Sequence, residues 1–322
     1  MDRRFNYIER KDGIGLLGCY GTTGEVKLPE RLRGKRILSL EAYAFSSSEP
    51  EERPEMQSLE EAHSAFAGEL IPQRGREVTK IWIPSGVERI GNYCFYGCGC
   101  LEEMTFTDRL RDIGGGAFTG CRLKRLEIDF LEGEKSCLKD VTAENRYELQ
   151  VTLRHHAGDG SVQTAKVLFP EHYEEAVENT PARIVMTHYH GSGGNYRQCF
   201  YQKELDYKEY DELFPHAVAW EETGVLLRLV FGRLLYPYRL SVQAKERYQD
   251  YLREHAEAAA ELWILQEDIR GLRYLTEEAL LDRQAMEAAI AFASERGRIE
   301  LLSYLMEAKN RLFPAGKRVF VW

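Results

Sequence analysis

Residues 78–128 read VTKIWIPSGVERIGNYCFYGCGCLEEMTFTDRLRDIGGGAFTGCRLKRLEI and repeat themselves every 22 to 23 residues. Positions of the first copy recur 23 residues later: Ile81, Ile83, Ile90, Phe95, Gly97 and Cys98 become Met104, Phe106, Ile113, Phe118, Gly120 and Cys121. Leu101 recurs as Leu123, and the strand begins again at Leu126 and Ile128. A repeat of this length is typical of one solenoid coil, which cannot bury its apolar face alone. The stretch therefore predicts stacked coils with an outward ladder of side chains suited to recognition.

The strand of each coil is visible in the tetrapeptide IWIP at residues 81–84. Alternation puts its two isoleucines on one face and Trp82 on the other, and the proline ends the pairing because it has no N–H to donate. Gly91 and Gly114 each follow an inward isoleucine. We expect a positive φ at both glycines, where the chain turns.

These motifs resemble the BspA-like, or treponemal, class of bacterial leucine-rich repeat. Coils of that class run strand, Ile-Pro, Ile-Gly, Ala-Phe, Gly-Cys, Leu, and residues 78–128 follow this order. Residues 7–45 are similar to a first coil, so the resemblance covers about residues 7–130. It is interrupted at residues 46–77, a segment rich in Glu, Ser and Pro that we interpret as a charged surface insertion. The resemblance implies protein recognition, and some relatives are surface adhesins.

Beyond residue 141 the period stops and a different pattern begins. Residues 147–153 alternate at period two, a Gly-Asp-Gly turn follows, and residues 162–169 form a second run, which together predict a β-hairpin. Further strands fit residues 183–190 and 196–202. We therefore expect a β-rich middle domain.

From residue 241 the pattern is helical almost to the end. This region has its own repeat at an offset of 30: Glu257, Ala258, Ala259, Leu262, Ile269, Leu272, Tyr274 and Leu275 return as Glu287, Ala288, Ala289, Phe292, Ile299, Leu302, Tyr304 and Leu305. Thirty residues fit one helical hairpin. Residues 257–311 are similar to ankyrin repeats, although the Thr-Pro-Leu-His opening is missing.

The sequence thus predicts an α+β chain in three parts. Residues 1–135 form a short leucine-rich-repeat solenoid with its charged insertion at 46–77. Residues 141–238 form the β-rich middle domain, and residues 241–315 form an α-helical, ankyrin-like C-terminal region.

Composition limits the partners and the compartment. A formal charge of -9 and a pI near 5.6 disfavour nucleic acid, which needs clustered Lys and Arg. No apolar run approaches the ~20 residues of a membrane span, and the charged start is not a secretory signal. Seven cysteines without an export signal indicate reduced thiols, so we expect a cytoplasmic protein.

The outward ladder is the candidate binding surface. The repeat stacks Trp82, Thr105 and Glu127 on one face, beside a second row formed by Lys80, Glu103 and Arg125. Aromatic and Arg side chains carry much of the energy at binding hot spots. We expect a scaffold or adaptor that binds another protein through this face, without catalysis or cofactor. The alternative is that the middle domain folds back and covers the face.

Two further functions stay open. His188 and His190 lie on one face of a predicted strand, about 6–7 Å apart, so they are candidate metal ligands of a metal-dependent hydrolase or ligand-binding middle domain. Structural or surface histidines are the competing interpretation. Elsewhere in the chain, the cluster of Cys94, Cys98 and Cys100 suggests a zinc site, but Cys98 has its coil partner Cys121 and is better explained by packing. The other function is a BspA-type adhesin.

Overall fold

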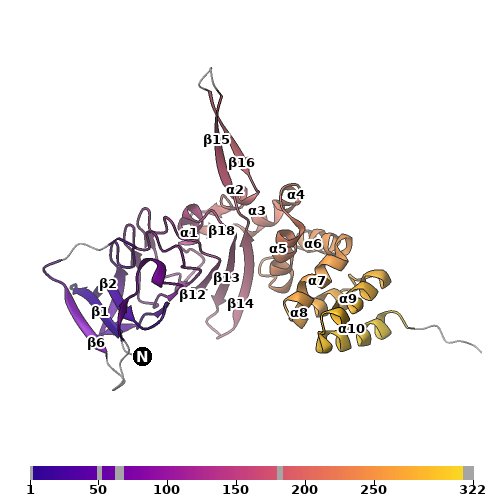
Figure 1. The fold of residues 1–322 in the computed structure, drawn as a ribbon, viewed down its shortest axis with the longest axis horizontal. Coiled ribbons are helices and arrows are strands. Elements are labelled where there is room, and N and C mark those ends of the chain that lie inside the picture. Colours follow the sequence, from indigo (N-terminus) through magenta and orange to yellow (C-terminus); the bar gives the residue numbers. More distant parts are fainter. Residues whose placement is uncertain (1–2, 49–52, 62–68, 180–183, 315–322) are drawn as a thin grey trace, which may run out of the picture. The chain divides into compact units, whose positions relative to one another are not determined.

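The computed structural model describes residues 3–48, 53–61, 69–179 and 184–314. They group into two compact units, Met1–Leu213 and Phe214–Trp322, which are described separately below (Figure 1). The first unit contains the repeats of 22 to 23 residues, and the second is helical.

The first unit is built around a six-stranded sheet, which we call the ladder sheet. Its strands lie in the spatial order β14-β13-β12-β10-β8-β3. All neighbouring strands are parallel except β13 and β14, which are antiparallel. Each parallel strand begins one coil of the solenoid. The strands are β3 (Glu25–Lys27), β8 (Lys80–Trp82), β10 (Glu103–Thr107), β12 (Arg125–Phe130), β13 (Leu149–His156) and β14 (Val162–Phe169).

A second sheet runs through the turns of the same coils. Four of its strands are parallel neighbours: β2 (Ile14–Gly21), β5 (Lys35–Leu40), β9 (Arg89–Ile90) and β11 (Asp112–Ile113). Antiparallel strands complete it: β1 (Arg3–Glu9), β4 (Arg31–Leu32), β6 (Gln57–Glu61) and β7 (Ile71–Pro72). Residues 57–61 and 71–72 belong to the predicted insertion, so the described part of this insertion extends the second sheet. The short helix η1 (Gly75–Glu77) leads back into the coils.

Between the two sheets, equivalent residues of successive coils stack on one another. The ring of Phe95 lies between those of Phe45 and Phe118, with centroids 5.3 and 5.5 Å away. The thiol of Cys98 donates to the carbonyl oxygen of Phe45, and the thiol of Cys121 donates to that of Phe95, both at 3.1 Å. The packing role predicted for these two cysteines is therefore confirmed.

The backbone conformations of the coil glycines differ from those predicted. The prediction of a positive φ at Gly91 and Gly114 is wrong; the left-handed glycines of these coils include Gly97 (φ 73°), Gly116 (φ 68°) and Gly120 (φ 81°). Gly91 is required for close approach instead, because a Cβ there would lie 2.4 Å from the backbone nitrogen of Ala42. This requirement arises because the backbones of neighbouring coils stack closely, and the sequence of one coil alone does not show that contact.

The hairpin predicted for the middle domain continues the solenoid. β13 pairs in register with β12, and helix α1 (Leu138–Glu144) connects the two strands. The Glu144 carboxylate accepts the backbone N–H groups of Gly116 and Phe118 at 2.9 and 2.7 Å, which joins α1 to the preceding coil. The predicted boundary at residue 135 thus falls between two adjacent strands of one sheet.

The rest of the first unit is irregular. β15 (Tyr173–Asn179) and β16 (Ile184–His190) pair only with each other in a two-stranded sheet (Figure 1). The strand predicted at residues 196–202 is wrong: the chain forms helix α2 (Gly193–Tyr196) and then the short hairpin of β17 (Phe200–Tyr201) and β18 (Glu204–Leu205). Helix α3 (Tyr207–Glu212) follows.

A buried arginine explains why the strand fails to form. The Arg197 guanidinium donates to the carbonyl oxygens of Pro170 (2.6 Å), Gly193 (2.8 Å) and Asn145 (2.9 Å), among others. Burial lowers the pKa of this side chain to about 10. A Cβ at Gly193 would lie 2.0 Å from the Pro170 oxygen, so the helical turn needs glycine there.

In residues 214–314, the described part of the second unit, the regular elements are helices. They are α4 (Phe214–Val218), α5 (Thr223–Leu235), α6 (Val242–Glu254), α7 (Ala256–Leu265), α8 (Ile269–Glu277), α9 (Arg283–Glu295) and α10 (Ile299–Leu312). Residues 214–235 were expected in the β-rich middle domain, and this expectation is wrong. The run VLLRLVFGRLL of α5 is apolar almost throughout, so its periodicity does not separate helix from strand.

The 30-residue repeat appears as two helical hairpins, α7 with α8 and α9 with α10. Each first helix ends in the same way: Glu267 and Gly297 adopt positive φ angles of 55° and 65°. The following N–H groups, of Asp268 and Arg298, return to carbonyls five residues back. The hairpins are therefore structural repeats, while their likeness to ankyrin stays a prediction.

Candidate functional site

The outward face of the ladder sheet brings the six predicted residues together. Register places Trp82, Thr105 and Glu127 in one row across β8, β10 and β12. The adjoining row contains Lys80, Glu103 and Arg125. Arg125 is exposed and the other five are half-buried, so the face is open to solvent within the first unit. Their role in binding stays a prediction.

The charges of this face are paired with one another. Glu103 forms ion pairs with Lys80 at 2.8 Å and with Arg125 at 2.5 Å. Hydrogen bonds from Arg125 and Lys80 lower the pKa of the Glu103 carboxyl. The Lys80 ammonium also lies 4.4 Å from the centre of the Trp82 ring. These contacts hold the long side chains in place, which reduces the entropy that a partner must overcome on binding.

The network of ion pairs extends to β13, which was predicted to belong to the middle domain. Arg154 of β13 binds Glu127 at 2.7 Å and Asp129 at 3.5 Å, and His156 lies 2.8 Å from Asp129. Arg154 and His156 were not assigned to this face, because the hairpin was placed in a separate domain. The alternation in residues 147–153 gave the only signal, and it did not identify the neighbouring strand.

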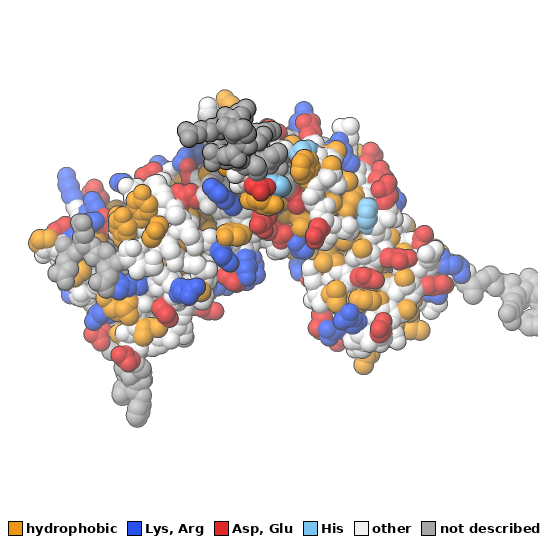
Figure 2. All heavy atoms as spheres, turned by 45° about the horizontal axis from the view of Figure 1, so that its top comes forward, with side chains coloured by type: hydrophobic (Ala, Val, Ile, Leu, Met, Phe, Trp, Pro, Cys, Tyr) orange, Lys and Arg blue, Asp and Glu red, His pale blue; other side chains and the backbone are white. Residues whose placement is uncertain are grey.

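The hairpin of the middle segment does not cover the ladder face in the manner considered above. β13 and β14 lie beside β12 in the plane of the sheet and lengthen the face. On the view in Figure 2, acidic, basic and hydrophobic side chains are interspersed over each unit. That view therefore shows no large surface of a single charge sign that would attract an oppositely charged partner over a distance.

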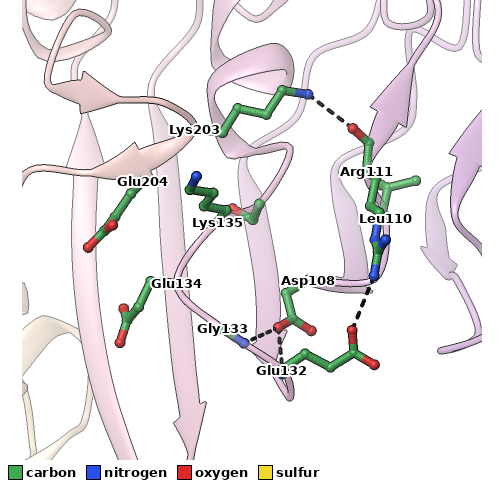
Figure 3. A pocket seen from close by; sticks show the side chains of 10 residues that line it. Asp108, Leu110, Arg111, Glu132, Gly133, Glu134, Lys135, Lys203 and Glu204 are labelled. Carbon is green, nitrogen blue, oxygen red and sulfur yellow. Dashed lines mark hydrogen bonds and ion pairs between the residues drawn. The ribbon is translucent and has the colours of Figure 1, made fainter.

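A pocket of about 560 Å³ opens beside the ends of β10 and β12 (Figure 3). Its wall contains both signs of charge: Arg111, Lys135 and Lys203 with Asp108, Glu132 and Glu134. Asp108 Oδ2 accepts the backbone N–H groups of Glu132 and Gly133 at 2.7 and 2.9 Å, which fixes the loop after β12. Figure 3 shows Glu134 and Glu204 on one side of the pocket and Arg111 on the other.

One cation of this pocket, Lys203, stabilises the fold. Lys203 binds Asp140 Oδ2 at 2.9 Å. It also donates to the Arg111 carbonyl at 3.1 Å (Figure 3). Burial opposes the charge on Lys203, but the hydrogen bond with Asp140 and the nearby acidic groups together outweigh burial and raise the pKa of the ammonium. The neighbouring Cys137 thiol has a pKa raised to about 12 by burial. It is therefore protonated at neutral pH and unsuited to nucleophilic catalysis.

The candidate metal ligands lie on β16. His190 Nε2 is 3.0 Å from Glu175 Oε2, and its ring stacks on Tyr173 with centroids 4.3 Å apart. His188 pairs in register with Glu175, but its side chain lies outside the described part of the structure. Within the described residues, no group of three or more His, Cys, Asp or Glu side chains is placed to hold a metal ion. A metal role for the two histidines stays a prediction.

Comparisons with known proteins place the repeats. Among the described residues, no helix has the length and apolar character needed to cross a membrane. No curated protein and no solved structure matches the chain. Residues 74–156 match the family described as BspA type Leucine rich repeat region (6 copies), and this match ends at the last residue of β13. It confirms the resemblance inferred from the coil motifs, so residues 74–156 are a BspA-type leucine-rich repeat region.

Proposed function

We propose that the protein is an interaction scaffold or adaptor that binds another protein through the outward face of its ladder sheet. The observation that carries the proposal is the pair of rows from Trp82 to Glu127 and from Lys80 to Arg125, held in register across three strands. Leucine-rich repeats are associated with protein interaction, and a solenoid presents an extended binding surface.

Trp82 is the expected anchor of this surface. It is the large aromatic side chain of the face, and Lys80 and the paired charges around it form a polar rim. Hot spots combine such an aromatic centre with surrounding contacts that exclude water. Thr105, which pairs with Trp82 in the sheet, offers a hydroxyl group to the backbone of a partner.

The compartment belongs to the same proposal. All seven cysteines are free and six are buried, which supports a reducing environment such as the cytoplasm. Display on the cell surface would instead make the same face an adhesin. Fractionation of the native host, followed by detection of the protein in each fraction, separates the two.

The experiment compares the intact chain with Trp82→Ala and Arg125→Ala variants. Partners are captured from host lysate, identified, purified and titrated against each form. We expect each variant to weaken binding by about tenfold or more, since loss of a hot-spot side chain removes at least ~1.4 kcal/mol. Trp220→Ala is the matched control, because Trp220 is 55% exposed in the second unit.

Circular dichroism and a melting curve establish that each variant is folded. Equal affinities of the intact chain, Trp82→Ala and Arg125→Ala would remove the ladder face from the proposal. Weakened binding by Trp220→Ala alone would assign recognition to the helical unit.

A further inference from the structure

A second pocket, which we call the arginine pocket, lies where the turns of the first two coils stack. Its volume is about 330 Å³, and its polar lining comprises Arg10, Ser39, Glu41, Arg53, Arg89 and Asn92. These side chains come from the β1–β2 turn, the end of β5, the insertion and the β9 turn. The pocket is separate from the ladder face, because its residues belong to the second sheet and its turns.

Glu41 is the fixed anion of the arginine pocket. Its side chain is 10% exposed; Oε1 accepts from Ser39 at 2.7 Å and from Arg10 at 2.9 Å. Oε2 accepts from Arg10 at 2.9 Å and from Arg53 at 3.3 Å. Burial opposes ionisation, but these hydrogen bonds and charges lower the pKa of the carboxyl. Glu41 is thus ionised and saturated with donors.

The pocket retains positive charge after Glu41 is counted. Three guanidinium groups line it against one carboxylate, and Arg89 has a second acidic neighbour, Asp112, at 3.2 Å. One positive charge is left even when Asp112 is included. The side chains of Arg10 and Arg53 are 54% and 32% exposed, and each contacts Glu41 through one terminal nitrogen. Their remaining N–H groups suit an anion from solution, and guanidinium groups bind carboxylates well.

Exposed tyrosines follow directly on two lining positions of the pocket. Tyr43 comes after Ala42 and Tyr93 comes after Asn92. Their rings stack with centroids 5.4 Å apart, and Tyr96 meets Tyr93 edge-on at 6.0 Å. The three rings are 36%, 41% and 39% exposed. They form an aromatic surface at the rim of the turns, which we call the tyrosine stack.

The backbone beneath this stack is strained. Tyr43 and Tyr93 have φ angles of 61° and 54°, in the left-handed region that bulky residues avoid. The next coil has Gly116 at the same station, with φ 68°. Glycine fits this turn without strain, so the two tyrosines keep an unfavourable conformation while burying their rings only in part. Strain retained at an exposed site indicates a functional constraint.

We propose that the arginine pocket and the tyrosine stack together bind an acidic sugar, a uronate residue of a polysaccharide. The carboxylate binds Arg10 and Arg53, the sugar hydroxyls exchange hydrogen bonds with Asn92 and Ser39, and the apolar face of the ring packs on the tyrosine stack. A neutral sugar leaves the surplus positive charge unused. An inorganic anion leaves the tyrosines without a role.

Calorimetric titration of the full chain tests the proposal with trimers of galacturonate and of glucuronate. Neutral galactose trimer and inorganic phosphate are the comparison ligands. We expect at least one uronate trimer to bind, and neither comparison ligand to match its affinity. The Arg53→Gln variant, which leaves Arg10 and Ser39 on Glu41, should bind about tenfold more weakly.

Tyr93→Asn removes the ring while keeping a residue that tolerates positive φ, and we expect a similar loss of affinity. Tyr201→Ala, at a tyrosine that is 71% exposed elsewhere in the first unit, should bind as the unmodified chain does. The proposal is overturned by equal binding of the galactose trimer or of phosphate. It is also overturned by unchanged affinity in both pocket variants, or by no binding of either uronate.

Discussion

The solenoid and the helical unit both contain internal repeats, but the repeats contact one another differently in the two units. In the solenoid, each residue contacts its own equivalent in the next coil, as Phe45, Phe95 and Phe118 do. In the helical unit, contacts join different positions: the hydroxyl of Thr276 lies 2.6 Å from that of Tyr304, although the repeat offset is 30. In-register stacking keeps the same residue type at each station, whereas helix faces tolerate many combinations.

The largest effect should come from breaking the stack of phenylalanines. Phe95→Ala removes a fully buried ring between two others, and we expect a loss of about 3–5 kcal/mol in the unfolding free energy of the first unit. Urea denaturation followed by circular dichroism measures it. Met286→Ala, fully buried in α9, is the counterpart in the helical unit, with an expected loss of about 2–5 kcal/mol.

The two variants also sharpen the comparison between the units. If the units unfold separately, each variant shifts only its own transition. A single transition that shifts equally for both variants would show that the two units unfold together.

The glycines offer a smaller and more specific contrast. Gly91→Ala forces a Cβ to within 2.4 Å of the neighbouring coil's backbone, so we expect a loss of about 1–3 kcal/mol. Gly297→Ala meets no atom within 4 Å and strains only the left-handed φ, with an expected loss of about 1–2 kcal/mol. Thermal melting of both variants measures the difference. An unchanged melting temperature in Gly91→Ala would contradict the close contact at Gly91.

The pH dependence of the first unit should reveal Glu41. Its folded pKa lies below the ordinary value of 4.5, so its stabilisation is present above that pH and is lost as pH falls through the folded pKa. We expect Glu41→Gln to lose about 1.5–3 kcal/mol at neutral pH, as for hydrogen bonds to charged groups. The difference between the variant and the unmodified chain should shrink below pH 4.5. A constant difference between pH 7 and pH 3 would contradict this role.

The smallest effect is expected on the ladder face. Glu103→Gln removes ion pairs to Lys80 and Arg125 that water screens, so we expect a loss of less than about 1 kcal/mol. The loss should diminish in 1 M salt, where the screening length is about 3 Å. A melting curve at low and high salt measures both values. A large loss that is insensitive to salt would mean that the pairs support the fold itself.

Several features could be predicted because they depend on neighbours in the chain. Trp82, Thr105 and Glu127 were placed on one face from alternation and period alone, and their register agrees. The C-terminal helical hairpins followed from their 30-residue offset. The arginine pocket could not be predicted, because Arg10, Glu41 and Arg53 lie far apart in the sequence.

The sequence by itself determined the coil and its inward and outward residues. Each of these depends on a period that a single strand and turn impose on the chain. Only the tertiary structure decided that β13 joins β12, that Arg197 holds distant carbonyls, and that two arginines meet at Glu41. These contacts depend on which segments become neighbours after stacking, and the local pattern of hydrophobic and polar residues does not encode that choice.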